Sequence, residues 1–349
     1  MNTLLKNMML ALLVLGIGQA AWADDTLNVG GVAQKEMLQL AEAGDAELQL
    51  ALGVMYEQGK GIRQDYTEAV RWYRKAAEEQ GFAVAQYNLG RMYEQGKGVR
   101  QDYAEAAGWF RKAADQGFAE AQNNLGAMYK DGKGIRQDDN QAVQWYRKAV
   151  EQGVAAAQYN LGLMYYEGRG VRQDYKQALQ WYRKAAGQGY KDAQNNLGVM
   201  YKDGKGVRKD YVQAVKWYRK AAERGNAEAQ YNLGVMYTEG QGVRQDDAQA
   251  VQWFRRAVEQ GDANAQYNLG VMYAKGRGVR QDYVQTLQLW HKAARHGVAE
   301  AQSGLGWMYY TGRGVRQNSV IAKEWYKKAC DNGLQDGCND YRQLNNEGH

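Results

Sequence analysis

Residues 121–149 read AQNNLGAMYKDGKGIRQDDNQAVQWYRKA, and nearly the same segment occurs eight times along the 349-residue chain. The Leu-Gly pair of each copy begins at Leu52, Leu89, Leu125, Leu161, Leu197, Leu233, Leu269 and Leu305. The first interval is 37 residues and the other six are 36. A fixed period of this size is typical of structural units that stack on one another, so the sequence predicts a repeat architecture rather than one central core.

Each copy predicts a pair of antiparallel helices. Ala121, Leu125 and Met128 lie at positions i, i+4 and i+7, which is one face of a helix that we place at about residues 118–130. Gly132 and Gly134 follow, and two glycines two residues apart suit a turn in which φ is positive. We call the first helix of each pair helix A and the second helix B.

Helix B is expected to begin at an aspartate. Asp138 is a suitable N-cap, and Gln141 three residues later completes the pattern of a capping box, in which each side chain bonds the backbone N–H of the other residue. Trp145 and Tyr146 belong to the apolar face of this helix, and Gly153 is expected to end it.

Small residues and tryptophans recur at fixed places in the copies. Gly126 lies in the middle of helix A, where glycine costs up to about 1 kcal/mol relative to alanine. Its recurrence in all eight copies predicts that helix B approaches there too closely for a side chain. Helix B carries a tryptophan column that we expect to fill space between units: Trp72, Trp109, Trp145, Trp181, Trp217, Trp253 and Trp325. The seventh copy has Leu289 in this place and Trp290 beside it, which predicts local repacking.

The beginning of the chain has the features of a signal peptide. Lys6 is positive, residues 8–18 are apolar, and Ala21-Trp22-Ala23 has the small-x-small form of a cleavage site. We therefore expect residues 1–23 to be removed by cleavage after Ala23, which gives a periplasmic or secreted protein. The apolar run is too short to span a bilayer, and we expect no membrane span elsewhere.

The remaining chain divides by the repeat pattern. We expect an N-terminal capping helix in residues 24–43, eight repeats in residues 44–332, and a C-terminal capping helix and tail in residues 333–349. Terminal caps of this kind keep the ends of a stacked array soluble.

The shared pattern A-x-x-Q-x-x-L-G-x-M-Y-x-x-G-x-G-V-x-x-D-x-x-x-A-x-x-W-Y-x-x-A-A resembles the Sel1-like repeat family, relatives of the tetratricopeptide repeat, over about residues 33–344. The resemblance implies an all-α fold, a right-handed α/α superhelical solenoid of helix-turn-helix repeats. It also implies that helix A lines a concave surface through which the protein binds other proteins as a scaffold or adaptor. We therefore expect protein partners, no cofactor and no enzymatic activity.

The concave surface is expected to use helix A positions whose residues differ between copies. One such column is mostly tyrosine and asparagine, and tyrosine suits recognition because it combines a large area, few rotamers and a polar tip. The candidate partner-binding residues are Tyr87, Asn88, Arg91, Asn123, Tyr159, Tyr166, Asn195, Tyr231, Tyr267, Trp307 and Tyr310. Trp307 with Tyr310 is the sharpest candidate, since no other copy has that pair. The alternative is that some of the tyrosines only pack between neighbouring helices.

The only two cysteines are Cys330 and Cys338, at the end of the last helix B and the start of the C-terminal capping helix. These positions face each other across a short turn, so we predict a disulfide. It would close a loop of about nine residues, contribute roughly 2–3 kcal/mol in the chain-entropy model, and pin the capping helix. Reduced thiols are the alternative, and the signal peptide favours the disulfide.

Few residues are available for catalysis or metal binding. The three histidines, His291, His296 and His349, form no zinc-ligand spacing with the cysteines, and we expect them to face solvent. The only serines, Ser303 and Ser319, lie in no G-x-S-x-G or S-x-x-K motif. We expect no metal site.

An enzymatic alternative remains through the family resemblance. A cysteine-rich branch of the Sel1-like family is associated with β-lactam binding and weak β-lactamase activity, and it carries a cysteine pair in repeat after repeat. This chain has one pair, at the last junction. Turnover of nitrocefin by the purified protein would test this alternative.

The charge of the chain leaves a second alternative open. The net charge is +6, and arginines form columns such as Arg136 and Arg172. Aspartate columns lie beside them, and any charge in a repeated motif forms a column. We expect a solvated, charge-balanced face and no nucleic-acid partner; the alternative is a binder of anionic cell-envelope or host glycans or proteins.

Overall fold

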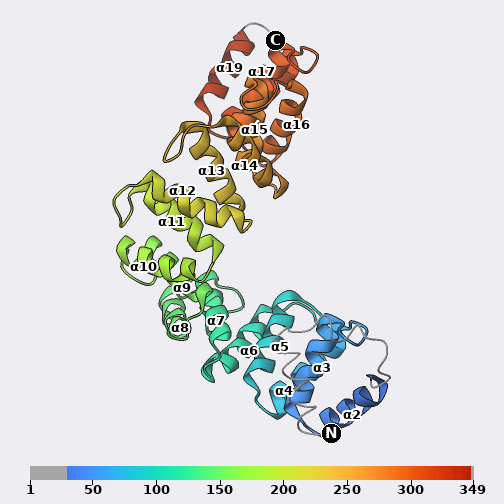
Figure 1. Ribbon diagram of the computed structural model, residues 1–349. Coiled ribbons are helices and arrows are strands. Elements are labelled where there is room, and N and C mark those ends of the chain that lie inside the picture. The colour runs from blue at the N-terminus through green and yellow to red at the C-terminus, as the bar shows by residue number, and fades with distance from the viewer. Residues whose placement is uncertain (1–29, 347–349) are drawn as a thin grey trace. The chain divides into compact units, whose positions relative to one another are not determined.

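The computed structural model describes residues 30–346, and these residues form 18 helices and no strand. The all-α prediction is therefore confirmed. The predicted signal peptide and its cleavage site after Ala23 lie outside the described residues. The chain divides between Asp174 and Tyr175 into two compact units, and within each unit consecutive helices pack side by side (Figure 1).

The first unit contains a capping helix, three complete helix pairs and one further helix A. Its helices are α2 (Gly30–Glu42), α3 (Ala46–Gln58), α4 (Tyr66–Glu79), α5 (Ala83–Gln95), α6 (Tyr103–Asp115), α7 (Ala119–Asp131), α8 (Asp139–Glu151) and α9 (Ala155–Glu167). Odd numbers from α3 onward mark helix A, and even numbers from α4 onward mark helix B.

The second unit begins with a helix B, continues through four helix pairs and ends with a capping helix. Its helices are α10 (Tyr175–Gly187), α11 (Lys191–Asp203), α12 (Tyr211–Glu223), α13 (Ala227–Glu239), α14 (Asp247–Glu259), α15 (Ala263–Lys275), α16 (Tyr283–Arg295), α17 (Ala299–Thr311), α18 (Ser319–Asp331) and α19 (Gln335–Asn346).

The turn between helix A and helix B is built by glycines, as predicted. Gly132 ends α7 with φ of 66° and donates its N–H to the carbonyl of Met128, and Gly134 has φ of 68°. A side chain at either position would be strained because L residues rarely adopt this conformation.

The start of helix B confirms half of the predicted capping box. The Asp138 carboxylate accepts hydrogen bonds from the backbone N–H groups of Asn140 and Gln141 at 2.9 and 3.0 Å. The reciprocal bond to Gln141 was a wrong prediction, because the Asp138 N–H donates instead to the carbonyl of Tyr129 at 3.0 Å. The N-cap thus ties helix B to the preceding helix A, and the Gln141 side chain is not needed to satisfy it.

The mid-helix glycine has the predicted role. A Cβ added to Gly126 would lie 2.7 Å from the ring of Tyr146 on α8, so only glycine allows this contact between the two helices. Leu125 and Met128 beside it are buried, as is Tyr146. The apolar stripes of both helices therefore close on each other, and this burial is the main stabilising term of each repeat.

The tryptophan column fills space between repeats, and the seventh copy is repacked. Trp109 is buried in a cluster with Leu89 of its own repeat and with Leu50 and Tyr73 of the preceding repeat. In the seventh copy Leu289 and Trp290 are both buried, and the Trp290 Nε1 donates to the carbonyl of Tyr267 at 3.0 Å. Trp290 thus takes the place that Tyr146 has in the third copy.

A contact that we call the turn clasp joins each A–B turn after the first to the preceding helix B. A Cβ at Gly134, the second turn glycine, would lie 2.1 Å from the carbonyl of Tyr103, the first residue of α6. The residue between the two glycines reaches the side chain of the same first residue. Arg169 forms two hydrogen bonds with the Asp139 carboxylate, at 2.8 and 3.1 Å, whereas Lys133 lies over the ring of Tyr103.

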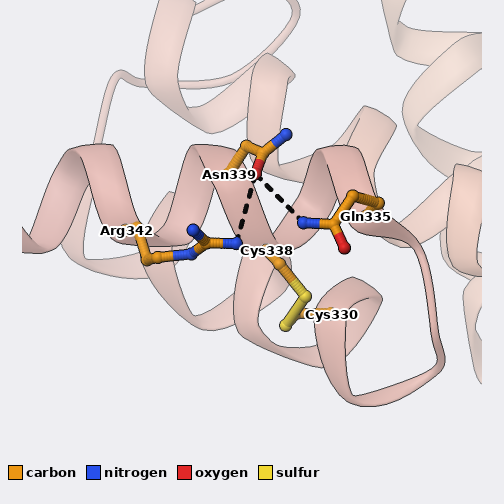
Figure 2. The surroundings of a disulfide bond; sticks show 5 residues. All are labelled: Cys330, Gln335, Cys338, Asn339 and Arg342. Carbon is orange, nitrogen blue, oxygen red and sulfur yellow. Dashed lines mark hydrogen bonds between the residues drawn. A yellow bond between two sulfur atoms is a disulfide. The ribbon is translucent and has the colours of Figure 1, made fainter.

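The C-terminal cap contains the predicted disulfide. Cys330 at the end of α18 is bonded to Cys338 on α19, with the two Cα atoms 4.4 Å apart (Figure 2). Around it, the side chain of Asn339 accepts hydrogen bonds from Gln335 and Arg342 within α19. The last helix is therefore attached both covalently and through the burial of Leu344.

Candidate functional site

The candidate partner-binding residues lie on the A helices, and most are half-buried. Tyr87 on α5 contacts the rings of Phe110 and Phe118, with ring centroids 5.7 and 5.1 Å apart. Tyr231 and Tyr267 contact the rings of the following helix B, each with ring centroids 6.0 Å apart. Each ring therefore packs within its own repeat and stays half-buried, and the Arg91 guanidinium also lies over the Tyr87 ring.

Burial also fixes the chemistry of these rings. It raises the pKa of Tyr87, Tyr231 and Tyr267, so that all three hydroxyls remain protonated over the range in which proteins are stable. The Tyr231 hydroxyl additionally accepts a hydrogen bond from Asn268 at 3.4 Å. Each hydroxyl therefore keeps a proton with which it can donate a hydrogen bond.

An asparagine column links successive A helices, and the sequence analysis missed its role. The Asn160 amide donates to Asn123 at 3.0 Å, and the Asn232 amide donates to Asn195 at 3.3 Å. The signal was present, because asparagine recurs directly before the Leu-Gly pair at Asn88, Asn124, Asn160, Asn196, Asn232 and Asn268. Asn195 is only 1% exposed, so it positions Asn232 and offers almost no surface of its own.

The first repeats add a charged group to this surface. Arg91 on α5 donates to Asn88 and to Glu57 on α3, each at 3.4 Å. Glu57 also accepts a 2.6 Å hydrogen bond from the buried Tyr73 hydroxyl. Asn88 and Arg91 are thus held by neighbours within the protein, with Arg91 half-buried and Asn88 buried.

The last repeats carry the largest aromatic group. Trp307 on α17 is half-buried, and the guanidinium of Arg313 lies 4.8 Å from its ring centroid. Arg313 also donates to the Tyr283 hydroxyl at 3.0 Å. Tyr310 packs against the cluster formed by Tyr326 and Leu344, whereas Tyr159 and Tyr166 are half-buried on α9 in the first unit.

The B helices present basic side chains that are held on aromatic rings, a pairing that the sequence analysis did not identify. The ammonium groups of Lys112 and Lys148 lie 3.7 and 3.8 Å from the centroids of the preceding tryptophan rings. Arg147 donates to the hydroxyl of Tyr165 at 3.2 Å. These contacts reflect the repeat spacing and reduce the freedom of the cations.

His291 does not face solvent as expected. It is half-buried against the edge of Trp325, with ring centroids 5.4 Å apart. Burial lowers the pKa of His291, and the nearby cations Arg295 and Lys328 lower it further. His296 is exposed and caps the end of α16.

The described residues contain no group of three or more histidine, cysteine, aspartate or glutamate side chains arranged to hold a metal ion. Ser303 lies on α17 and Ser319 begins α18, both half-buried. Within residues 30–346, no helix combines the length and apolar character needed to cross a membrane.

Comparison with known families identifies the repeat. A model of the Sel1 repeat matches eight consecutive segments: residues 46–80, 83–118, 119–154, 155–190, 191–226, 227–262, 263–298 and 299–334. No curated protein matched the chain.

Two solved structures are similar to this chain over most of its length. The first is c5321, a protective antigen present in uropathogenic Escherichia coli strains that displays an SLR fold. It is 40% identical, with a TM-score of 0.76, and the match covers 88% of this chain but only 66% of that chain. The second is a Sel1 repeat protein from Oxalobacter formigenes, 36% identical with a TM-score of 0.67, and the match covers 90% of this chain and 91% of that one.

The period, the helix pairs, the turn glycines and these matches agree, and this chain belongs to the Sel1 repeat family.

Proposed function

We propose that this protein is an extracytoplasmic scaffold or adaptor that binds other proteins through the surface of its A helices. One observation carries the proposal. Four repeats place a half-buried tyrosine ring at the variable position and a fifth places the half-buried Asn123 amide there, and hydrogen bonds such as Asn160 to Asn123 link these positions between repeats. Prearranged aromatic groups with polar tips favour protein recognition because little side-chain entropy is lost on binding.

The concave placement of this surface is part of the proposal. It follows from the arrangement that the resemblance implies, in which helix A lines the inner side of a right-handed superhelix. The variable residues, including Tyr87, Asn123 and Tyr231, all lie on A helices, which supports one shared binding surface within each unit.

The extracytoplasmic location rests on two features. The Cys330–Cys338 disulfide is of a kind that persists in oxidising compartments and is rare in the cytosol. The sequence of residues 1–23 has the charge, apolar run and Ala21-Trp22-Ala23 end of a secretory signal. We infer cleavage after Ala23 and a periplasmic or secreted mature chain, and N-terminal sequencing of the exported protein tests this.

The binding surface is tested with variants of three rings. Residues 24–349 are used as bait in a periplasmic extract, the captured protein is identified and purified, and its affinity is measured by calorimetry. We expect Tyr159→Ala, Tyr231→Ala and Trp307→Ala to weaken binding by about tenfold or more where the ring is a hot spot.

A matched control uses the other surface of the repeats. Val284 is 54% exposed at the start of α16, a helix B, so Val284→Ala removes apolar surface without touching the A helices. This variant is expected to bind as the wild type does. Circular dichroism verifies that all variants are folded. Unchanged affinity in all three ring variants would reject the A-helix surface.

A further inference from the structure

Repeats are joined by a glutamine after helix B, which we call the junction glutamine. Gln152, directly after α8, donates to the carbonyl of Gly117 at 2.9 Å and to the side-chain oxygen of Gln122 at 3.0 Å. Gln116 makes the same two bonds one repeat earlier, at 2.7 and 2.8 Å. At these two places the oxygen of the buried A-helix glutamine is satisfied by the junction glutamine of its own repeat, while the bond to Gly81 or Gly117 reaches the preceding repeat.

This pattern breaks at two junctions of the second unit, where the buried side-chain oxygens of Gln194 and Gln266 have no hydrogen-bond partner. Arg224, directly after α12, replaces the junction glutamine, and its guanidinium lies beside Gly189. Gln194 on α11 is 3% exposed and donates to the carbonyl of Ala186 at 3.1 Å, but its Oε1 is buried without a hydrogen-bond partner. A buried acceptor that lacks a donor is costly, so this junction is built differently from its neighbours.

The same junction contains a pocket. Its volume is about 590 Å³, and its lining includes Gln194, Trp217, Lys220, Glu223 and Arg224 together with the end of α10. Gly187 also lines it, at a position where other repeats carry a carboxylate, namely Asp115, Glu151 and Glu259. Nothing lies within 4 Å of the Cβ position of Gly187, so the missing side chain leaves open space.

The charges of this pocket favour an anion. Lys220 is held with its ammonium 4.5 Å from the centroid of the Trp217 ring, and Arg224 adds a second cation. Glu223 is the one carboxylate among the lining residues. The pocket at Arg71 in the first unit has three cations and two glutamates, and it differs because both Arg71 and Lys75 there form ion pairs with Glu42.

We propose that the pocket around Gln194 and Arg224 binds an acidic sugar, such as the uronate unit of a glycan. Arg224 and Lys220 recognise the carboxylate of the sugar through charge-assisted hydrogen bonds. A sugar hydroxyl donates to the Gln194 Oε1, and the ring lies beside the indole of Trp217. A bare anion lacks the donor for Gln194, and a neutral sugar lacks the charge for Arg224.

Apart from Gln194, the residues that line this site lie outside the A helices, so the site does not depend on the proposed function. The two can be distinguished with the full mature chain, residues 24–349. Arg224→Gln is the informative variant, because it restores the junction glutamine found in other repeats. It should fold, and it should unfold at a higher temperature than the wild type because Gln194 gains its donor.

The experiment is a titration with sodium glucuronate, followed by the NMR signals of the Trp217 indole and the Gln194 side-chain amide. Glucose and sodium acetate are titrated in parallel as a neutral sugar and a bare carboxylate. We expect saturable shifts with glucuronate, at least tenfold weaker binding of glucose and acetate, and at least tenfold weaker glucuronate binding to Arg224→Gln. Tyr231→Ala serves as the control and should bind glucuronate normally.

Several results would reject an acidic-sugar site in this pocket. Absence of saturable shifts up to about 50 mM glucuronate, which is weaker than specific recognition requires, rejects it. So does undiminished binding to Arg224→Gln. Equal binding of acetate rejects the sugar, and binding of a peptide carboxylate more tightly than glucuronate assigns the pocket to a chain terminus instead.

Discussion

At the scale of single residues, the role of each helical glycine depends on which atoms lie next to its Cβ position. Gly126 lies against the ring of Tyr146, whereas Gly108 on α6 is exposed with nothing within 4 Å of its Cβ position. Both are helical, so both would gain helix propensity on replacement by alanine. Only one of them has room for the methyl group.

We predict opposite effects of the same substitution at these two glycines. Gly126→Ala should destabilise the protein, because overpacking against Tyr146 costs about 1–3 kcal/mol. The higher helix propensity of alanine offsets up to about 1 kcal/mol of this cost. Gly108→Ala should stabilise it by about 0.5–1 kcal/mol. Urea denaturation of both variants measures the difference, and a stabilising Gly126→Ala would contradict the close approach of the two helices.

His291 should make stability depend on pH. Its pKa in the folded protein lies below the usual value of 6.5 because of burial and neighbouring cations. Unfolded chains then bind the proton more readily, so stability is full above about pH 7 and falls as the pH drops through 6.5 toward the lowered pKa. The free energy of unfolding of His291→Phe, measured between pH 5 and 8, should not show this loss of stability at low pH. An identical pH profile for the variant would show that other groups cause it.

Residue-level prediction from sequence succeeded where a backbone rule decides the outcome. Gly132 needed a positive φ and Asp138 needed to cap a helix, and both roles follow from local chemistry. The asparagine bond from Asn232 to Asn195 joins residues 37 apart, so local rules could not reveal it. The capping box failed for the same reason, since the carbonyl of Tyr129 reaches the Asp138 N–H from the preceding helix.

At the scale of helices, two substitutions in the seventh and eighth repeats, Trp290 and Gly304, fit together. Trp290 lies on two glycines, and a Cβ would lie 2.5 Å from its ring at Gly270 and 2.6 Å at Gly304. The position equivalent to Gly304 is an asparagine in each of the six preceding repeats, from Asn88 to Asn268. The larger ring on α16 thus requires the smaller residue on α17.

This fit predicts a strong coupling between α16 and α17. Gly304→Asn alone should destabilise the protein by about 1–3 kcal/mol because the side chain collides with Trp290. Combination with Trp290→Tyr, the residue found at Tyr146 and Tyr218, should recover part of that loss. A double-mutant cycle by chemical denaturation should give a coupling of about 0.5–3 kcal/mol, and additive effects would contradict it.

The disulfide should hold one helix rather than the whole array. Replacement of Cys330 and Cys338 by serine should lower stability by about 2–3 kcal/mol in the chain-entropy model. The loss should be concentrated in α19, because this terminal helix packs on α18 and only weakly on α17. Hydrogen exchange should therefore speed up in residues 335–346 and stay unchanged in α11–α15. Uniform acceleration along the chain would contradict this.

At the scale of the whole molecule, each helix packs mainly on the helices next to it in sequence within its unit. Stability in such an array is a sum of repeats and their interfaces. The period in the sequence was enough to predict this architecture, because the Leu-Gly spacing repeats with almost no variation. The pocket at Gln194 could not be predicted, because it arises from Gly187 and Arg224 acting together across a junction.

We predict that removal of one complete repeat is tolerated. Deletion of residues 227–262 joins Asn226 to Ala263, and Asn226 caps its helix as Asp262 does. Helicity per residue should stay constant, and the dependence of unfolding free energy on urea should decrease with the smaller buried surface. Deletion of residues 227–244 should instead unfold much of the second unit, because two B helices would then be adjacent. Equal damage from both deletions would contradict independent repeats.

The turn clasp has a consequence for how such a chain can change over generations. Where helix B begins with Asp139 or Asp247, the next turn carries arginine, and where it begins with Tyr103 or Tyr175 the next turn carries lysine. After Tyr283 the next turn carries Arg313, and after Tyr211 it carries Gln241. A duplication or loss of one period in the gene keeps every helix but exchanges the neighbours at one seam. The new seam keeps an ion pair wherever a lysine or arginine meets aspartate, and it keeps a cation–ring contact wherever the cation meets tyrosine, as Arg313 does at Tyr283. Recombination among these nearly identical segments is therefore tolerated at most seams, and only a turn without a cation, such as that of Gln241, leaves the contact unmade.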